Sequence, residues 1–391
     1  FPFTLTGILY FPKIKNNLDV RKDRIQLYCN QVFVTDSVEG VVPDFMMLLQ
    51  GVIDSPDIPL NVSRSYLQAD RNVKKISTYI TKKVAARLEE LSKKDTKAFE
   101  EKWKDIKIFI EYGMLSDEKF CEQAMKFALV SDTEGQFFKL DDYKKLIEGN
   151  QTDKDGNLVY LYATDKEAQY SYIKAANDKG YNVLMMDGQL DIPFVSMLEQ
   201  KNEKSRFVRV DSDVIDNLIR KEDDKKSELS ADEQAMASTL FKSQIPAIEK
   251  SEFYVSFAAL AATDQPVVIT QSEYMRRMKE MAQFQSGMNF YGELPNAYNL
   301  TLNTNHPVVK KVIEAANSSL EGELKPVNDE LKATNAVIEA IKSLDKDGKG
   351  VPEDKKADLK TNEDKATELR AKKDELISKY AAGNDTVKQL I

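Results

Sequence analysis

The sequence predicts a multidomain protein that combines α/β and α+β folds. Its 391 residues are enough for two or three domains, each with its own core. Short apolar strands alternate with helical patterns over residues 158–210, as in a small α/β unit with a parallel sheet. Residues 221–235 are charged and poor in apolar side chains, which is typical of a segment between domains.

Strands dominate the beginning of the chain. Residues 5–11 and 25–35 are apolar, aromatic and β-branched, and a polar loop separates them. Residues 42–53 then lead to a turn that Pro56 and Pro59 stiffen. After this turn, apolar residues recur every three or four positions, which predicts a long helix with one apolar stripe.

Helical patterns continue to residue 147 and indicate a small helical subdomain. Trp103 lies in one of them, and we interpret it as a core residue rather than a platform for a ligand. The α/β unit then has strands at 158–163, 181–186 and 207–210, with a helix predicted over 165–179. The turns after its first two strands are not glycine-rich, so they offer no nucleotide-binding fingerprint.

Residues 236–391 predict an α+β domain that carries a helical insertion. The predicted strands and helices of the α+β part are 253–260, 267–270, 272–285, 297–302 and 307–316. Residues 318–383 consist mainly of Glu, Asp, Lys and Ala with sparse apolar positions, and the turn-rich segment 345–354 divides them. The simplest interpretation is a protruding hairpin of two antiparallel helices.

Composition excludes several classes of protein. The net charge of −8 argues against a general nucleic-acid binder, whose affinity depends on neutralised phosphates. No apolar run approaches the roughly 20 residues that span a bilayer, so we expect a soluble protein without a membrane partner. Cys29, Cys121 and the single histidine, His306, cannot assemble a zinc site or a disulfide framework, which favours a cytoplasmic location.

No catalytic or metal-binding constellation emerges from the sequence. His306 lies in a turn-like segment before a proline, so we expect a loop or cap residue rather than a catalytic base. Asp153 and Asp345 each begin a segment similar to a calcium loop, but Thr164 and Lys356 stand where the bidentate glutamate belongs. We therefore expect no metal site, and no enzymatic activity from this chain alone.

One arginine occupies a position that a helix disfavours. Asn61 and Ser63 are both suitable N-cap residues, so the first long helix is expected to start between them. Arg64 then falls in the first turn, where the helix dipole disfavours a cation. Two interpretations remain: an ordinary surface arginine, or an arginine that a stiff loop aims at an anionic group.

The segment around this arginine carries a family resemblance. The residues Gly51-Val-Ile-Asp-Ser-Pro-Asp-Ile-Pro-Leu-Asn-Val-Ser-Arg64, preceded by Arg24-Ile-Gln-Leu-Tyr-Cys-Asn-Gln-Val-Phe-Val-Thr-Asp36, resemble the middle domain of the 90-kDa heat-shock chaperone family, most closely its bacterial form. The resemblance covers roughly residues 1–316 and resumes at 385–391. Both ends of the chain look cut, and we interpret it as a piece of a longer protein.

The resemblance implies a domain order. Residues 1–147 would be the large α/β sandwich part of the middle domain with its helical subdomain, and 148–220 its small αβα part. Residues 221–235 would form the linker, and 236–391 a truncated C-terminal domain that contains the charged helical insertion 318–383. In the family, an ATP-binding domain precedes the middle domain.

The resemblance also implies a role for the arginine. In the family, the preceding domain binds ATP with Mg²⁺. An arginine of the middle domain extends to this site and contacts the γ-phosphate. By motif that residue is Arg64, with Gln68 one turn further along and Asn61 at the start of the motif. A guanidinium that neutralises charge on a transferring phosphoryl group is the role of an arginine finger. Ser65 stands where the family commonly has glutamate, which changes the charge beside Arg64.

A second candidate site is a methionine-bearing helix. Met275, Met278 and Met281 fall on one face, Phe284 follows one turn further on, and Met288 extends the apolar surface. Such a stripe is commonly core packing, but methionine also suits adaptable binding surfaces. In the family, an amphipathic helix at this place contacts unfolded clients, and the resemblance therefore implies client binding.

Taken as a whole, the resemblance implies the middle and C-terminal segment of an ATP-dependent stress-response chaperone. Its partners would be unfolded or partly folded client proteins, its own N-terminal ATPase domain and a second protomer. Dimerisation of this chain would be weak or absent, because the family pairs its protomers through helices at the extreme C-terminus. The alternative is a non-enzymatic helical scaffold or protein-binding module without coupling to ATP.

Overall fold

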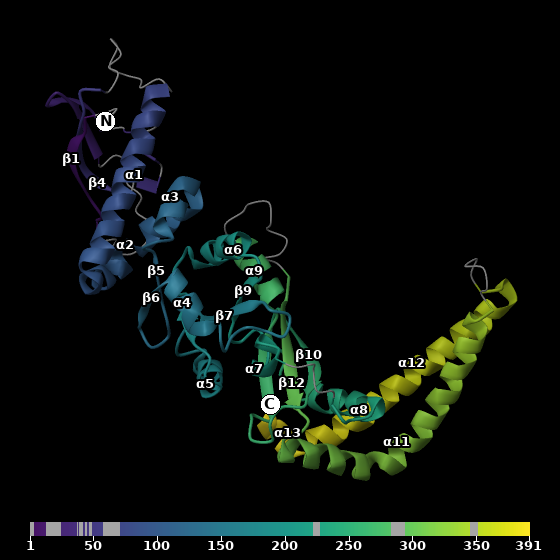
Figure 1. Cartoon of the computed structure of the whole chain (residues 1–391). Helices are drawn as coiled ribbons and strands as arrows, with labels where there is room; N and C mark the ends of the chain where they lie inside the picture. The colour runs from purple at the N-terminus through teal and green to yellow at the C-terminus, as the bar shows by residue number, and fades with distance from the viewer. Residues whose placement is uncertain are drawn as a thin grey trace. The chain divides into compact units, whose positions relative to one another are not determined.

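The computed structural model describes most of the chain (Figure 1). The described residues are 4–12, 25–36, 38, 42–43, 45–46, 49–57, 71–221, 227–282, 294–344 and 351–391, with only the backbone described at 71–73 and 280–282. The chain divides into two compact units, unit 1 from Phe1 to Val210 and unit 2 from Asp211 to Ile391. Mixed α/β structure with several small sheets is confirmed, whereas the finer domain boundaries stay predictions.

Unit 1 begins with a four-stranded sheet of order β1-β4-β2-β3. Its strands are β1 (Thr6–Tyr10), β2 (Ile25–Cys29), β3 (Val32–Thr35) and β4 (Gln50–Asp54). β2 runs parallel to β4, whereas the β1–β4 and β2–β3 pairs are antiparallel. The apolar segment 25–35 forms a hairpin rather than one strand, because Asn30 and Gln31 adopt positive φ angles of 50° and 67° that suit a tight turn.

A helical subdomain follows this sheet. Its helices are α1 (Arg71–Lys94), α2 (Thr96–Ser116) and α3 (Glu118–Ala124). Side chains cap two of the junctions: Asp95 accepts a hydrogen bond from the Ala98 amide at 3.0 Å, and Asp117 accepts one from the Phe120 amide at 2.8 Å. Trp103 is 3% exposed and lies among the core residues of unit 1, which confirms the prediction that it packs in the core.

The last part of unit 1 begins with a short hairpin over residues 129–139, where a helical subdomain was predicted, and continues with the predicted α/β unit. Its elements are β5 (Leu129–Ser131), β6 (Phe137–Lys139), α4 (Leu140–Ile147), β7 (Leu158–Ala163), α5 (Tyr170–Asp178), β8 (Val183–Met185), α6 (Asp191–Lys201) and β9 (Ser205–Arg209). β7 is parallel to both β8 and β9, which confirms a parallel sheet. All six residues of β7 are buried, as expected of a central parallel strand covered on both faces.

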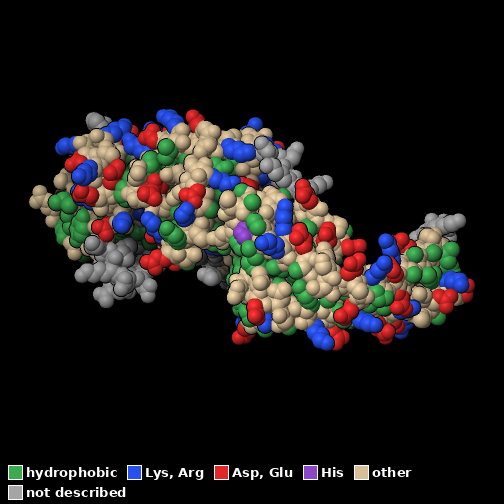
Figure 2. Space-filling model, turned by 90° about the horizontal axis from the view of Figure 1, so that it is seen from below, with side chains coloured by type: hydrophobic (Ala, Val, Ile, Leu, Met, Phe, Trp, Pro, Cys, Tyr) green, Lys and Arg blue, Asp and Glu red, His purple; other side chains and the backbone are tan. Residues whose placement is uncertain are grey.

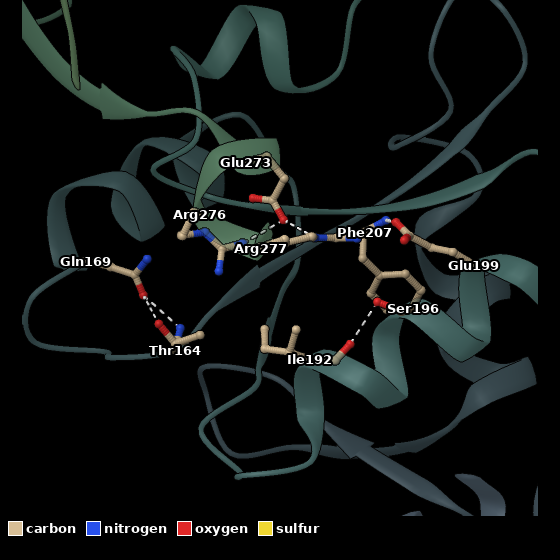
Figure 3. Close-up of polar contacts among 9 residues, drawn as sticks. All are labelled: Thr164, Gln169, Ile192, Ser196, Glu199, Phe207, Glu273, Arg276 and Arg277. Carbon is tan, nitrogen blue, oxygen red and sulfur yellow. Dashed lines mark hydrogen bonds and ion pairs between the residues drawn. The ribbon is translucent and has the colours of Figure 1, made fainter. Parts of the chain in front are cut away.

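Helix α5 begins five residues later than predicted, at Tyr170. The side chain of Gln169 folds back and accepts a hydrogen bond from the Thr164 amide at 2.7 Å (Figure 3). It also accepts one from the Asp165 amide at 3.0 Å. Asp165 in turn accepts hydrogen bonds from the amides of Glu167 and Ala168. These local bonds compete with the helix and hold residues 164–169 in turns.

Unit 2 contains a three-stranded sheet of order β10-β12-β11. From the start of unit 2 to β12, the described elements in chain order are α7 (Ile215–Leu218), α8 (Ala231–Lys242), β10 (Ser251–Ala258), β11 (Val267–Gln271), α9 (Glu273–Ala282) and β12 (Asn296–Asn303). β12 is parallel to β10 and antiparallel to β11. Helix α8 begins inside the segment 221–235 predicted to be a linker, because Ser230 and Glu233 form a reciprocal capping box.

Two long helices form an arm in unit 2 (Figure 1). They are α11 (Pro307–Lys342) and α12 (Glu353–Ala382), and the short α13 (Asp385–Leu390) follows them. The two long helices pack on one another, which confirms the predicted hairpin. The helix predicted to begin at 307–316 does begin at Pro307, and α11 continues from there into the hairpin without interruption. His306 is the N-cap of α11, and its Nδ1 accepts a hydrogen bond from the Val308 amide at 3.2 Å.

Candidate functional site

The phosphate-facing site predicted around Arg64, Gln68 and Asn61 lies outside the described residues. The structure describes the two elements that anchor this segment, namely β4 before it and α1 after it. At the end of β4, the Ser55 amide donates to the Tyr28 carbonyl at 3.0 Å, and the side chain of Ser55 is fully buried. The segment therefore leaves from a fixed point on the sheet.

Gly51 shows how closely β1 and β4 approach at this point. Its φ is 141°, and a Cβ atom there would lie 1.9 Å from the Ile8 carbonyl oxygen. Only glycine combines this backbone conformation with so close an approach. The Gly51 that begins the family motif therefore has a structural reason, which is the pairing of β1 with β4.

Helix α9 contains the described part of the second predicted site. Met275 and Met278 lie on it and are partly exposed, and Tyr274 beside them is 63% exposed. The structure describes the backbone of Met281 in this helix but not its side chain. Phe284 and Met288 lie outside the described residues. Among the described residues, neither Met275 nor Met278 belongs to the buried core.

The opposite side of α9 carries charges that pair within the helix. Glu273 Oε1 accepts from Arg276 Nη2 at 2.7 Å and from Arg277 Nε at 2.6 Å (Figure 3). Burial alone would raise the pKa of the Glu273 carboxyl, but Arg276 and Arg277 outweigh burial and hold that pKa below its ordinary value. Glu273 is therefore ionised at neutral pH, and the Glu273–Arg276–Arg277 pairs lie on the side of α9 away from Met275 and Met278.

A buried charged cluster in unit 1 was not anticipated from the sequence. Lys107 on α2 lies 2.8 and 2.9 Å from the two carboxylate oxygens of Asp191 on α6, and 3.7 Å from Glu111 Oε1. Asp191 is 0% exposed and also accepts a hydrogen bond from the Gly188 amide at 2.8 Å. The cluster therefore ties the helical subdomain to the α/β unit within unit 1.

Burial governs the ionisation of this cluster. Desolvation raises the pKa of Glu111 to about 9, with the charge of Asp191 adding to the rise and Lys107 opposing it. Glu111 is thus protonated at neutral pH and able to donate a hydrogen bond to Asp191. The signal available in the sequence was Lys107 and Glu111 at helical spacing on the apolar face that also carries Ile106 and Ile110.

The calcium-like loop at Asp153 is filled by its own backbone. Asp153 Oδ1 accepts hydrogen bonds from the amides of Asp155 and Asn157 at 3.0 and 2.7 Å. Donors therefore occupy the place where a cation would need oxygens. Within the described ranges, three or more His, Cys, Asp or Glu side chains nowhere gather as a metal site. No helix of the described part is long and apolar enough to cross a membrane.

Comparison with known proteins identifies the family. The family model described as "Hsp90 protein" matches residues 2–346, which is most of the chain. The chain therefore belongs to the Hsp90 family, which confirms the resemblance carried by the residues around Arg64.

The relatives are bacterial chaperones. The chain is similar to Chaperone protein HtpG of Bacteroides thetaiotaomicron, with 57% identity over 393 residues, covering 100% of this chain and 58% of that protein. It is similar to Chaperone protein HtpG of Porphyromonas gingivalis, with 56% identity over 397 residues and the same coverage. Chaperone protein HtpG of Roseobacter denitrificans is 29% identical over 337 residues, covering 80% of this chain and 50% of that protein. The chain spans less than two thirds of the length of these relatives.

Proposed function

We propose that this chain is the middle and C-terminal part of an ATP-dependent chaperone that binds unfolded or partly folded proteins. The observation that carries the proposal is the 57% identity to a bacterial HtpG chaperone across the whole chain. In the longer protein, an N-terminal domain would bind ATP and Mg²⁺, and two protomers would form the working unit. The proposed setting is the cytoplasm.

Arg64 is the residue that we assign to ATP hydrolysis. The assignment is supported by the Gly51–Arg64 motif, by the anchoring of the segment through Ser55, and by the chemistry of a guanidinium toward a transferring phosphoryl group. Gln68 and Asn61 are assigned as polar residues around it. ATP would supply the transferring phosphate, and this chain would supply the positive charge that faces it.

The methionine side of α9 is the surface that we assign to clients. Met275 and Met278 are partly exposed, unbranched and polarizable, so they adapt to apolar side chains of different shapes. The pairing of Glu273 with Arg276 and Arg277 supports the assignment, because these three charges lie on the side of the helix away from Met275 and Met278. Met281, Phe284 and Met288 would continue the same surface.

Replacing the two methionines tests this assignment. The variant Met275→Ser/Met278→Ser should suppress client aggregation several-fold less well than the parent chain, measured by light scattering of a heat-denatured enzyme. Its melting temperature should change little, because both side chains are partly exposed. The matched control is Met236→Ser in α8, a side chain only 3% exposed, which should lower the melting temperature. Unchanged suppression by the double variant would contradict client binding at α9.

A further inference from the structure

The arm formed by α11 and α12 has no role in the proposed function. The family model ends at residue 346, before α12 begins, whereas the relatives from Bacteroides and Porphyromonas cover the whole chain. The second helix of the arm thus lies outside the shared family pattern and is present in these similar relatives. The arm is therefore a candidate for a binding surface that is separate from Arg64 and α9.

The far end of the arm exposes apolar side chains. Val337 and Leu344 are 44% and 48% exposed, although the interior of the arm just below them is closed by Ile338 and Ile341. Figure 2 shows hydrophobic side chains gathered at this end, which is the right-hand end in the view. These two exposed apolar side chains lie at the same end of the arm.

These residues line a groove that we call the arm-tip groove. It has a volume of about 450 Å³ and is lined by Val337, Ala340, Ile341, Leu344, Lys355, Asp358 and Asn362. The first four residues form an apolar floor on α11 and its end. The last three lie on α12 and form a polar wall.

The polar wall has hydrogen-bonding capacity to spare. Asn362 Nδ2 donates to the Asp358 carbonyl at 2.8 Å, which leaves the Asn362 amide oxygen as an acceptor. Lys355 Nζ is 3.3 Å from Asp358 Oδ2, and its ammonium has three donors in all. An acceptor and a donor beside an apolar floor match the N–H and C=O groups of a peptide backbone next to an apolar side chain.

The size of the groove selects among occupants. A stable interface between two folded proteins buries about 800 Å² and involves roughly 20–30 residues on each side. A contact confined to the seven residues that line the arm-tip groove is smaller than such an interface, so the groove by itself suits a short segment better than a folded partner. A volume of about 450 Å³ instead accommodates one or two large side chains with the backbone between them.

We propose that the arm-tip groove binds a short extended segment of a non-native polypeptide. One or two apolar side chains would lie on Val337, Ile341 and Leu344, while the peptide backbone meets Lys355 and Asn362. This proposal rests on the proposed chaperone function and adds a second client contact, separate from α9. It also assigns a function to the arm, because the groove lies at the end of the arm, where α11 ends and α12 begins.

The test measures peptide binding to the full 391-residue chain. The probe is a fluorescein-labelled nonapeptide with a central Leu-Phe-Leu and Gly/Ser flanks, followed by fluorescence anisotropy. We expect Val337→Ser/Leu344→Ser to weaken binding about tenfold, because two apolar contacts are lost. A second variant, Ala340→Lys, retains a good helix former and should block the groove to a similar extent. The matched control Val308→Ser/Ile248→Ser changes two exposed apolar residues elsewhere in unit 2 and should bind within twofold of the parent.

The outcomes separate this proposal from the proposed function. Parent-like affinity in both tip variants, or an equal loss in the control, would overturn the groove as a peptide site. Sedimentation measures the oligomeric state. If the tip variants change it and leave peptide binding unchanged, the groove binds a second copy of the chain and the peptide proposal is wrong. Loss of peptide binding in the tip variants, together with no aggregation suppression by the parent chain, would retain the groove and refute the chaperone proposal.

Discussion

Lys107, Glu111 and Asp191 form a network in which three ionisable groups share one buried site. Removing charges from water is costly, and the site reduces this cost by leaving one carboxyl protonated. With Glu111 neutral, the Lys107 ammonium and the Asp191 carboxylate balance one another. Gly188 contributes both an amide donor and space, since a Cβ there would lie 2.9 Å from Asp191 Oδ1.

This network predicts a pH dependence of stability. The ordinary pKa of the Glu111 carboxyl is 4.5 and its pKa in the folded chain is about 9, so between these values the folded state holds a proton that the unfolded state lacks. Stability therefore falls as pH rises through this window, with a slope of at most about 1.4 kcal/mol per pH unit. Below the window both states are protonated, and above it both are ionised.

The variant Glu111→Gln checks this dependence. Glutamine cannot ionise, so its stability relative to the parent should increase steadily from pH 5 to pH 8.5. Scanning calorimetry across this range gives the difference in melting temperature at each pH. Glu101→Gln on the exposed side of α2 is the control and should follow the parent. Parallel curves for parent and Glu111→Gln would show that Glu111 keeps an ordinary pKa.

Among the elements, those with a strong local signal were predictable from the sequence. β7 matches its predicted range of 158–163, because a continuous apolar run fixes a buried parallel strand. The arm was predictable as a hairpin because a turn-rich segment divides two long charged helical patterns. His306 was predictable as a cap because it precedes a proline at the first position of a helix.

Elements decided by side-chain hydrogen bonds were predicted less well. The start of α5 depends on Gln169 bonding backward to Thr164, which leaves no periodic signal. The start of α8 within a charged segment depends on Ser230 and Glu233, whose spacing in the sequence is that of a capping box. The buried cluster at Glu111 could not be located, because Asp191 lies 84 residues from Lys107 in the chain.

The capping box makes a prediction at the level of the element. Ser230→Ala removes the acceptor for the Glu233 amide, which lies 3.3 Å from Ser230 Oγ, and should cost about 1 kcal/mol of local stability. Hydrogen exchange of the amides in the first turn of α8 should then accelerate about fivefold. Ser319→Ala, on the exposed face of α11, should leave exchange in α8 unchanged. Unaltered exchange in the Ser230 variant would mean that packing alone holds the start of α8.

At the scale of the whole molecule, the chain spans less than two thirds of the length of the HtpG chaperones that it resembles. The chain covers 58% of a relative's length, so the proposed ATP hydrolysis requires residues beyond it. Within the chain, the proposed contributions are separate: Arg64 toward the nucleotide, α9 and the arm tip toward clients. The residues around Arg64 were recognisable because the motif is long and ordered, although the position of the arginine alone left both a surface residue and a residue aimed at an anionic group as interpretations.

The competing account is a scaffold without coupling to ATP. It retains the arm and the methionine side of α9 as protein-binding surfaces, and it assigns no special role to Arg64. The two accounts therefore differ at one residue, and a variant of that residue distinguishes them.

The most direct measurement is ATP turnover by the longer protein with Arg64→Ala. We expect turnover to fall by at least tenfold, since an arginine finger acts on the transition state, while the affinity for ATP stays within a few-fold of the parent. Arg87→Ala is the matched control, because Arg87 is an exposed arginine on α1 that pairs with Glu90 at 2.7 Å. Parent-like turnover in the Arg64 variant would contradict the account and favour the scaffold.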